Sequence, residues 1–164
     1  MHDNPYQAPQ SNLAVRGSAE APPLWNPNAA VRWSLLFSPV FGALLHSRNW
    51  EALGEPEKAE TAWRWAMATI AYFVITIASG FVLSPAQEMA FDRVARFGGI
   101  ALLLGWYATS GRKQAHLIQA RYGKNYPRRG WGKPFLYTLL AIGLLVLVGF
   151  GEAMYADLHH DYPG

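Results

Sequence analysis

Two long stretches without a charged residue constrain the fold of this chain more than any other feature. Ala66–Leu83 runs for eighteen residues, and Phe135–Phe150 for sixteen, without Asp, Glu, Lys or Arg. About 20 apolar residues in a helix cross the ~30 Å hydrocarbon core of a bilayer. Only 15% of the chain is charged, against ~25% in soluble domains. Both stretches are therefore predicted to be transmembrane helices, near residues 66–83 and 135–154.

Two further apolar segments are less regular. Residues 90–110 reach the length of a span if the charged residues at their start lie at the membrane interface. Trp33–Leu45 has only thirteen residues, or ~20 Å of helix. Pro39 and Gly42 favour a kink or a turn there, so residues 30–46 are predicted either to span or to form a membrane-embedded hairpin. The predicted fold class is an all-α, polytopic helical membrane protein with three to four transmembrane helices.

The remaining residues divide the chain into three parts. Residues 1–28 are polar and rich in Pro, Asn, Gln and Ala, lack the basic-then-apolar order of a signal peptide, and are predicted to be a disordered tail. Residues 29–156 form the predicted helical membrane domain, and residues 157–164 an acidic C-terminal tail. Pro56 and Ser84-Pro85 have the residue types that begin helices, and Gly123 suits the end of a helix over Arg112–Tyr122.

Charge predicts the orientation. The loop of residues 111–134 holds seven Lys or Arg and no acid, whereas the segment after Phe150 holds three acids and no Lys or Arg. Basic loops next to spans stay in the cytoplasm, so we expect a multi-pass protein of the bacterial inner membrane with a periplasmic C-terminus. The N-terminal tail is periplasmic if residues 30–46 span, and cytoplasmic if they form a hairpin.

The basic loop is also the candidate binding site. Clustered Arg and Lys beside a membrane attract anionic lipid headgroups, and a membrane-protein partner could use the same surface. The alternative is that the charges only set the topology. Because the basic residues adjoin apolar spans, nucleic acid is not the expected partner. The candidate lipid- or partner-binding residues are Arg112, Lys113, Arg121, Lys124, Arg128, Arg129, Trp131 and Lys133.

Catalytic and metal-binding patterns are sparse. The chain has no cysteine, which excludes disulfides, thiol chemistry and Cys-based zinc sites. It has no HExxH motif and no phosphate-binding Gly loop, so we expect no catalytic residue, metal or cofactor. His159-His160-Asp161 is interpreted as part of a flexible tail, and Glu152 as a solvated acid at the outer boundary. A stripe of small residues, Ala101, Gly105 and Thr109, is predicted to support packing within the bundle.

Two parts of the sequence carry a resemblance. Asn4-Pro5-Tyr6-Gln7-Ala8-Pro9 resembles the NPYxAP opening of many small bacterial membrane proteins. The stretch NPNAAVRWSLLFSPVFGALLHSRNWEALGEPEKA and the later RYGKNYPRRGWGKP resemble a group of uncharacterised proteobacterial inner-membrane proteins. The resemblance covers most of the chain after Leu24. It implies a membrane location and a bacterial source, and it transfers no functional residue.

Two functions follow as hypotheses. The first is a non-enzymatic protein that acts by protein–protein contact in the bilayer, such as an immunity protein against a membrane-active secreted toxin. The second is a small transporter or channel subunit, which needs polar side chains facing a pathway inside the spans. The spans offer few of them: Thr69, Thr76, Ser79, Thr109 and Thr138.

Overall fold

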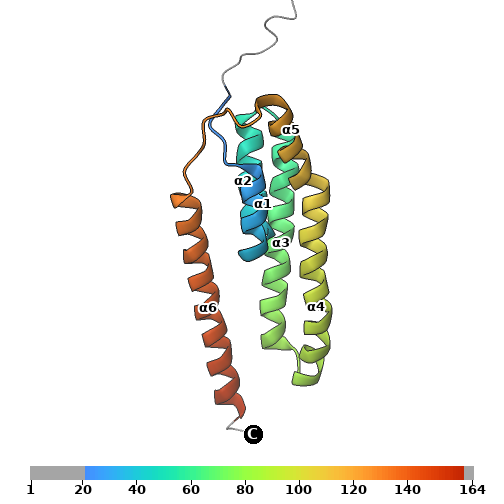
Figure 1. Ribbon diagram of the computed structural model, residues 1–164. Coiled ribbons are helices and arrows are strands. Elements are labelled where there is room, and N and C mark those ends of the chain that lie inside the picture. Colours follow the sequence, from blue (N-terminus) through green and yellow to red (C-terminus); the bar gives the residue numbers. More distant parts are fainter. Residues whose placement is uncertain (1–20, 161–164) are drawn as a thin grey trace, which may run out of the picture.

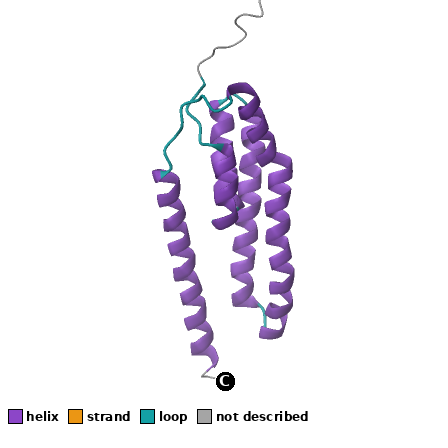
Figure 2. Ribbon diagram, in the orientation of Figure 1, coloured by secondary structure: helices purple, strands orange, loops and turns teal. Residues whose placement is uncertain are grey.

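The computed structural model describes residues 21–160, and the predicted all-α fold is confirmed for them, since no named strand occurs within this range (Figure 2). Figure 1 labels the helices in chain order. They are α1 (Pro27–Leu36), α2 (Pro39–Ala52), α3 (Pro56–Val82), α4 (Pro85–Trp106), the π-helix η1 (Tyr107–Gly111), α5 (Arg112–Tyr122) and α6 (Gly132–His160).

Proline and glycine set most of these boundaries. A proline occupies the first turn of each helix from α1 to α4, where its missing N–H costs nothing. Ser84 and Gln87 complete a capping box at the start of α4. Gly123 ends α5 with a φ of 60°, a conformation that glycine adopts without strain. The helix starts predicted at Pro56 and Pro85 and the helix predicted over Arg112–Tyr122 are confirmed.

The first apolar segment forms a hairpin of two short helices. The backbone is extended at Ser38, between α1 and α2. The chain then doubles back, so that the start of α1 lies beside the end of α2: Trp25 N donates to Asn49 Oδ1 over 3.0 Å, and the Pro27 carbonyl lies 3.3 Å from His46 Nε2. The single helix that a full span over residues 30–46 would need is therefore not formed. Residues 27–52 thus form a helical hairpin, and its embedding in a membrane stays a prediction.

A buried polar network ties this hairpin to α5. Asn49 is fully buried; its amide nitrogen donates to the Trp25 carbonyl over 2.9 Å and to Gln114 Oε1 over 3.1 Å. Gln114 in turn donates to the His46 carbonyl over 2.8 Å. Buried polar groups of this kind are stable only when their partners are in place. The network therefore fixes α5 against the open end of the hairpin.

Helices α3 and α4 pair as neighbours and pack against the hairpin. Trp106, at the end of α4, is completely buried, and it packs with Ala43 and Ala66. A Cβ atom added at Gly105 would lie 3.0 Å from the ring of Trp65 in α3. Gly105 therefore packs within the bundle, as predicted, whereas the other two residues of the small-residue stripe, Ala101 and Thr109, are exposed.

Helix α6 runs alongside the other helices (Figure 1) and meets them near its two ends. At its start, Phe135 packs with Phe41 and Trp131, with ring centroids 6.1 and 5.6 Å away. Near its end, the Glu152 carboxylate lies against Gly80 of α3. Glu152 is partly exposed, and its side chain packs between two helices; its place at the outer membrane boundary stays a prediction.

Two helices, α3 and α6, are long and apolar enough to cross a membrane. Only 11% of the apolar window of α3, and 6% of that of α6, is buried inside the protein. Core helices of soluble proteins pass the same test of length and composition, but they are mostly buried. Helix α4 lies outside this pair; its first half carries Glu88, Asp92, Arg93 and Arg96.

The structured region is longer than predicted at both ends. Residues 24–28, assigned to the disordered tail, hold a backbone bridge and the cap of α1. Helix α6 continues to His160, into the segment predicted as an acidic tail. Residues 1–20, which are predicted to be disordered and contain the NPYxAP opening, lie outside the described residues. The segment Asp161–Gly164 also lies outside them.

Candidate anion site at the basic end

The irregular part of the basic loop is pinned to the start of the helical domain. Leu24 N donates to the Pro127 carbonyl over 2.9 Å, and Arg129 N donates to the Leu24 carbonyl over 3.0 Å. The indole Nε1 of Trp25 donates to the Gly130 carbonyl, also over 3.0 Å. Leu24 itself is fully buried. Residues about one hundred positions apart are thus held side by side, and the loop is not a free surface segment.

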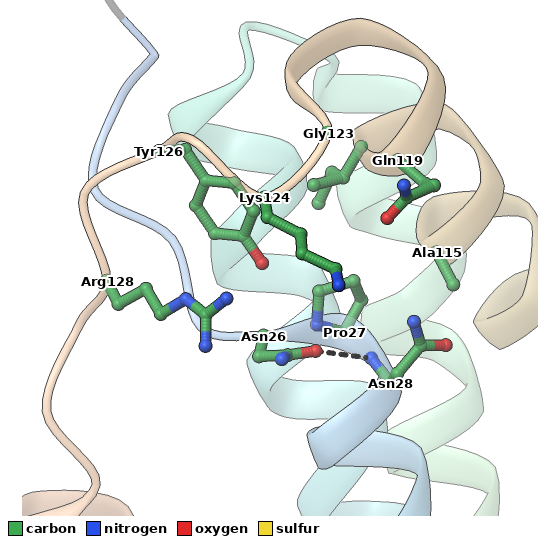
Figure 3. Close-up of a pocket in the computed structure, with 10 residues that line it drawn as sticks. Asn26, Pro27, Asn28, Ala115, Gln119, Gly123, Lys124, Tyr126 and Arg128 are labelled. Carbon is green, nitrogen blue, oxygen red and sulfur yellow. Dashed lines mark hydrogen bonds between the residues drawn. The ribbon is translucent and has the colours of Figure 1, made fainter.

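This pinning forms a cavity of about 130 Å³ between the start of α1, the end of α5 and the loop (Figure 3). The Lys124 side chain extends over Pro27 toward Asn28, and the Arg128 guanidinium points toward Asn26 (Figure 3). No Asp or Glu occurs among the described residues that line the cavity. These residues are Asn26, Pro27, Asn28, Ala115, Ile118, Gln119, Gly123, Lys124, Tyr126 and Arg128.

The cations, rather than the start of α1, give the cavity its preference for anions. The Asn26 side chain already accepts from the backbone N–H groups of Asn28 and Ala29, over 3.0 and 3.2 Å. The first free donors of the helix are therefore satisfied within the protein. The ammonium of Lys124 and the planar guanidinium of Arg128 remain available, and this pair is suited to a phosphate or carboxylate group.

Tyr126 contributes a neutral phenol to the same cavity (Figure 3). Burial raises the pKa of Tyr126 above its ordinary value, and the charge of Arg128 opposes that shift in part. The Arg128 guanidinium also lies over the Tyr126 ring, 5.6 Å from its centroid. The phenol therefore remains protonated through neutral pH, where it can donate a hydrogen bond to a bound anion.

The structure separates the eight predicted binding residues. Only Lys124 and Arg128 line this cavity, whereas Lys113 lines another. Arg129 lies over the ring of Trp25, 4.7 Å from its centroid, and Trp131 packs with aromatic side chains. The others lie apart on α5 and α6: Arg112 beside His116, Arg121 over Tyr122, and Lys133 in the first turn of α6.

Sequence reasoning missed the uncharged members of the site. Asn26, Asn28, Gln119 and Tyr126 line the cavity, but none belongs to a predicted site. One signal was present, since Asn26-Pro27 has the residue types of an N-cap followed by a first helical residue. No sequence signal links this helix start to Tyr126, because the link is made by backbone hydrogen bonds to Leu24.

The hydroxyl groups that a transport pathway would need are bonded to their own helices. Thr69, Thr76 and Ser79 of α3 donate to carbonyls of Trp65, Tyr72 and Thr76. Thr109 and Thr138 donate to carbonyls four residues earlier. These bonds use the hydroxyl protons locally, so the five side chains form no row of free donors.

No family model, curated protein or solved structure matches this chain.

Proposed function

We propose that this chain is a non-enzymatic integral membrane protein whose basic end binds anionic lipid headgroups at the cytoplasmic face of the bacterial inner membrane. The observation that carries this proposal is the convergence of Lys124 and Arg128 on one cavity that no described acidic residue lines. A phosphodiester is the anion most abundant at that face of a membrane, and juxtamembrane basic residues bind it electrostatically.

The proposed topology has three spans and one re-entrant hairpin. Helices α3, α4 and α6 cross the bilayer, with the charged first half of α4 at the periplasmic interface. At 1.5 Å per residue, α1 and α2, of ten and fourteen residues, measure ~15 and ~21 Å. Each is shorter than the ~30 Å core, which supports entry and return on one side. The N-terminal tail and the basic loop then share the cytoplasm, and the C-terminus is periplasmic.

A lipid-binding experiment tests the headgroup site. Full-length protein in nanodiscs of phosphatidylcholine with or without phosphatidylglycerol is analysed by native mass spectrometry for retained lipid. The double variant K124Q/R128Q should lose most of its preference for phosphatidylglycerol. The double variant R121Q/K133Q removes the same charge from the same loop outside the cavity, and should keep it. Equal losses in both variants would show that only the overall charge matters, and would refute the site.

Contact with another membrane protein is a second candidate function, and the exposure of α6 favours it. Positions Gly143, Gly149 and Gly151 have open space where a side chain would lie, and small residues of this kind let another helix approach closely in lipid. Immunity against a membrane-active toxin is the concrete version. Co-expression with the toxin candidate encoded next to this chain should restore growth; unchanged killing would exclude that pair.

A further inference from the structure

A second cavity, of about 340 Å³, lies on a different part of the same bundle. It is formed where the end of α2 and the start of α3 meet η1 and α5. None of its described lining residues is acidic. They are Trp50, Lys58, Thr61, Thr109, Ser110, Lys113 and Leu117. The cavity shares no lining residue with the one in Figure 3.

Two largely buried residues line this cavity with hydrogen-bond donors that have no partner in the described residues. Ser110 is 5% exposed and Trp50 is 3% exposed. Within residues 21–160, neither the Ser110 hydroxyl nor the Trp50 indole N–H makes a hydrogen bond. The two donor atoms themselves are not among the buried unpartnered side-chain atoms of the described residues, which are His46 Nδ1 and Trp106 Nε1. The Ser110 hydroxyl and the Trp50 N–H therefore face the open space of the cavity, where each can donate to a bound molecule.

Of the two lysines that line the cavity, one keeps an unpaired positive charge within the described residues. Lys58 pairs with Glu55 over 3.0 Å and lies 5.0 Å from the centre of the Trp50 ring. Lys113 has no ion pair within the described residues. The Thr61 and Thr109 hydroxyls donate to carbonyls of their own helices, so they present only lone pairs. The free donors are therefore one ammonium, one hydroxyl and one indole N–H.

The π-helix explains how Ser110 comes to be buried at this place. Short π-helical segments add an extra residue to a helical turn, and they occur frequently at functional sites. Here η1 supplies both Thr109 and Ser110 to the lining, and α5 continues from it directly with Lys113. The π-helix η1 and Lys113 thus belong to one continuous helical segment.

We propose that this second cavity binds a phosphate ester, with its phosphate oxygens accepting from Lys113, Ser110 and Trp50 and its organic part against Leu117. Charge-assisted donors favour an anion, and the cavity volume leaves room beyond the phosphate itself. The ester could be a phospholipid headgroup or a soluble phosphate ester, since both present the same group. The site is independent of the headgroup cavity and can exist without it.

Binding to purified full-length protein tests this site in two arms. The first arm titrates glycerol 3-phosphate into protein in neutral detergent by calorimetry. The second arm uses native mass spectrometry to measure phosphatidylglycerol that the K124Q/R128Q protein, whose headgroup cavity is disabled, retains from nanodiscs. Binding in the first arm identifies a soluble ester, and binding only in the second identifies a lipid. Absence of binding in both arms would overturn the proposal.

Matched variants assign any binding to this cavity. K113Q, S110A and W50F each remove one donor, and each should weaken binding about tenfold. R112Q changes the neighbouring residue of α5, which lies outside both cavities, and should leave binding unchanged. An equal loss in R112Q and K113Q would overturn the proposal. K124Q/R128Q should leave glycerol 3-phosphate binding in the first arm unchanged, so failure of the headgroup site is distinguished from failure of this one.

Discussion

At the scale of single residues, Gly42 is the position where the bundle has least room. A Cβ atom there would lie 2.1 Å from Ser34 Oγ and 2.4 Å from the ring of Trp106. Trp106 is completely buried, so it cannot swing away into solvent. The hairpin and α4 therefore approach each other as closely as a glycine allows.

We expect Gly42→Ala to destabilise the protein by about 1–3 kcal/mol, because overpacking a filled core forces neighbours to shift. Thermal unfolding followed by circular dichroism in detergent measures the change. Gly143→Ala is the matched control: nothing lies within 4 Å of that position, and alanine favours a helix over glycine. A Gly42→Ala variant that is as stable as Gly143→Ala would contradict the packing.

Tyr126 should carry a pH signature of the basic-end cavity. Its folded-state pKa is raised above 10.0 by burial. A raised pKa means that the folded state holds the proton more tightly. The resulting stabilisation is present below pH 10 and is lost as the pH rises through the folded-state pKa. The ultraviolet titration curve of the Tyr126→Phe variant is subtracted from that of the wild type. The difference should show one tyrosine that ionises at a higher pH in the folded protein than in denaturant. If the difference curve has the same midpoint in the folded protein as in denaturant, Tyr126 is not buried.

At the scale of helices, the join between the hairpin and the preceding segment depends on one side chain. Asn49 accepts from Trp25 N and donates to the Trp25 carbonyl. In Asn49→Ala both backbone groups lose their partner, and about 1–3 kcal/mol of local stability should be lost. Hydrogen exchange at the Trp25 amide measures this directly. Gln119→Ala, at an exposed residue of α5, should leave that amide protected; faster exchange in both variants would argue against a specific role for Asn49.

Helix positions were predictable from local chemistry, and helix pairing was not. Pro56, Pro85 and Gly123 mark their boundaries because a missing N–H or a positive φ is a property of one residue. The turn at Ser38 was left open, since Pro39 is compatible with either a kink or a reversal. The contact of Glu152 with Gly80 depends on the placement of two helices far apart in the chain. The sequence shows a charge there, but not its neighbour.

For the candidate site too, the basic residues were predictable from the sequence, but which of them lie together was not. The cations Lys124 and Arg128 were identified from the positive charge of their loop. Six further basic or aromatic residues were grouped with them, since charge clustering along a sequence cannot show which side chains converge. The choice of these two is made by the backbone bridge between Leu24 and Arg128, a long-range pairing of two isolated residues without a sequence pattern.

At the scale of the whole molecule, the two ends of the bundle differ in charge. The loop that holds the seven basic residues lies toward the end that carries α5, and α6 ends at the opposite end (Figure 1). Because the hairpin returns to the end where it began, residues 21–26 lie on the side of the basic loop. If the chain spans the membrane as proposed, positive-inside insertion places the two ends of the bundle in different compartments.

Cysteine labelling in intact cells tests this assignment. The chain has no native cysteine, so each introduced thiol reports alone. We expect Pro23→Cys and Lys133→Cys to react with a membrane-impermeant maleimide only after the inner membrane is opened, and Ser84→Cys to react before. A label on Pro23→Cys in intact cells would place the start of the chain outside, and would refute the re-entrant hairpin.

The bridge between Leu24 and the loop also has a consequence for biosynthesis. Trp25 and Gly130, whose hydrogen bond closes this end of the protein, are 105 positions apart. When α1 leaves the ribosome, the loop segment that pairs with Leu24 and Trp25 has not yet been translated. Until residues 127–130 have been made, the backbone groups of the first segment must be satisfied by water or by a chaperone. Completion of the headgroup cavity is thus among the last steps of assembly, and a chain truncated before Pro127 cannot form it.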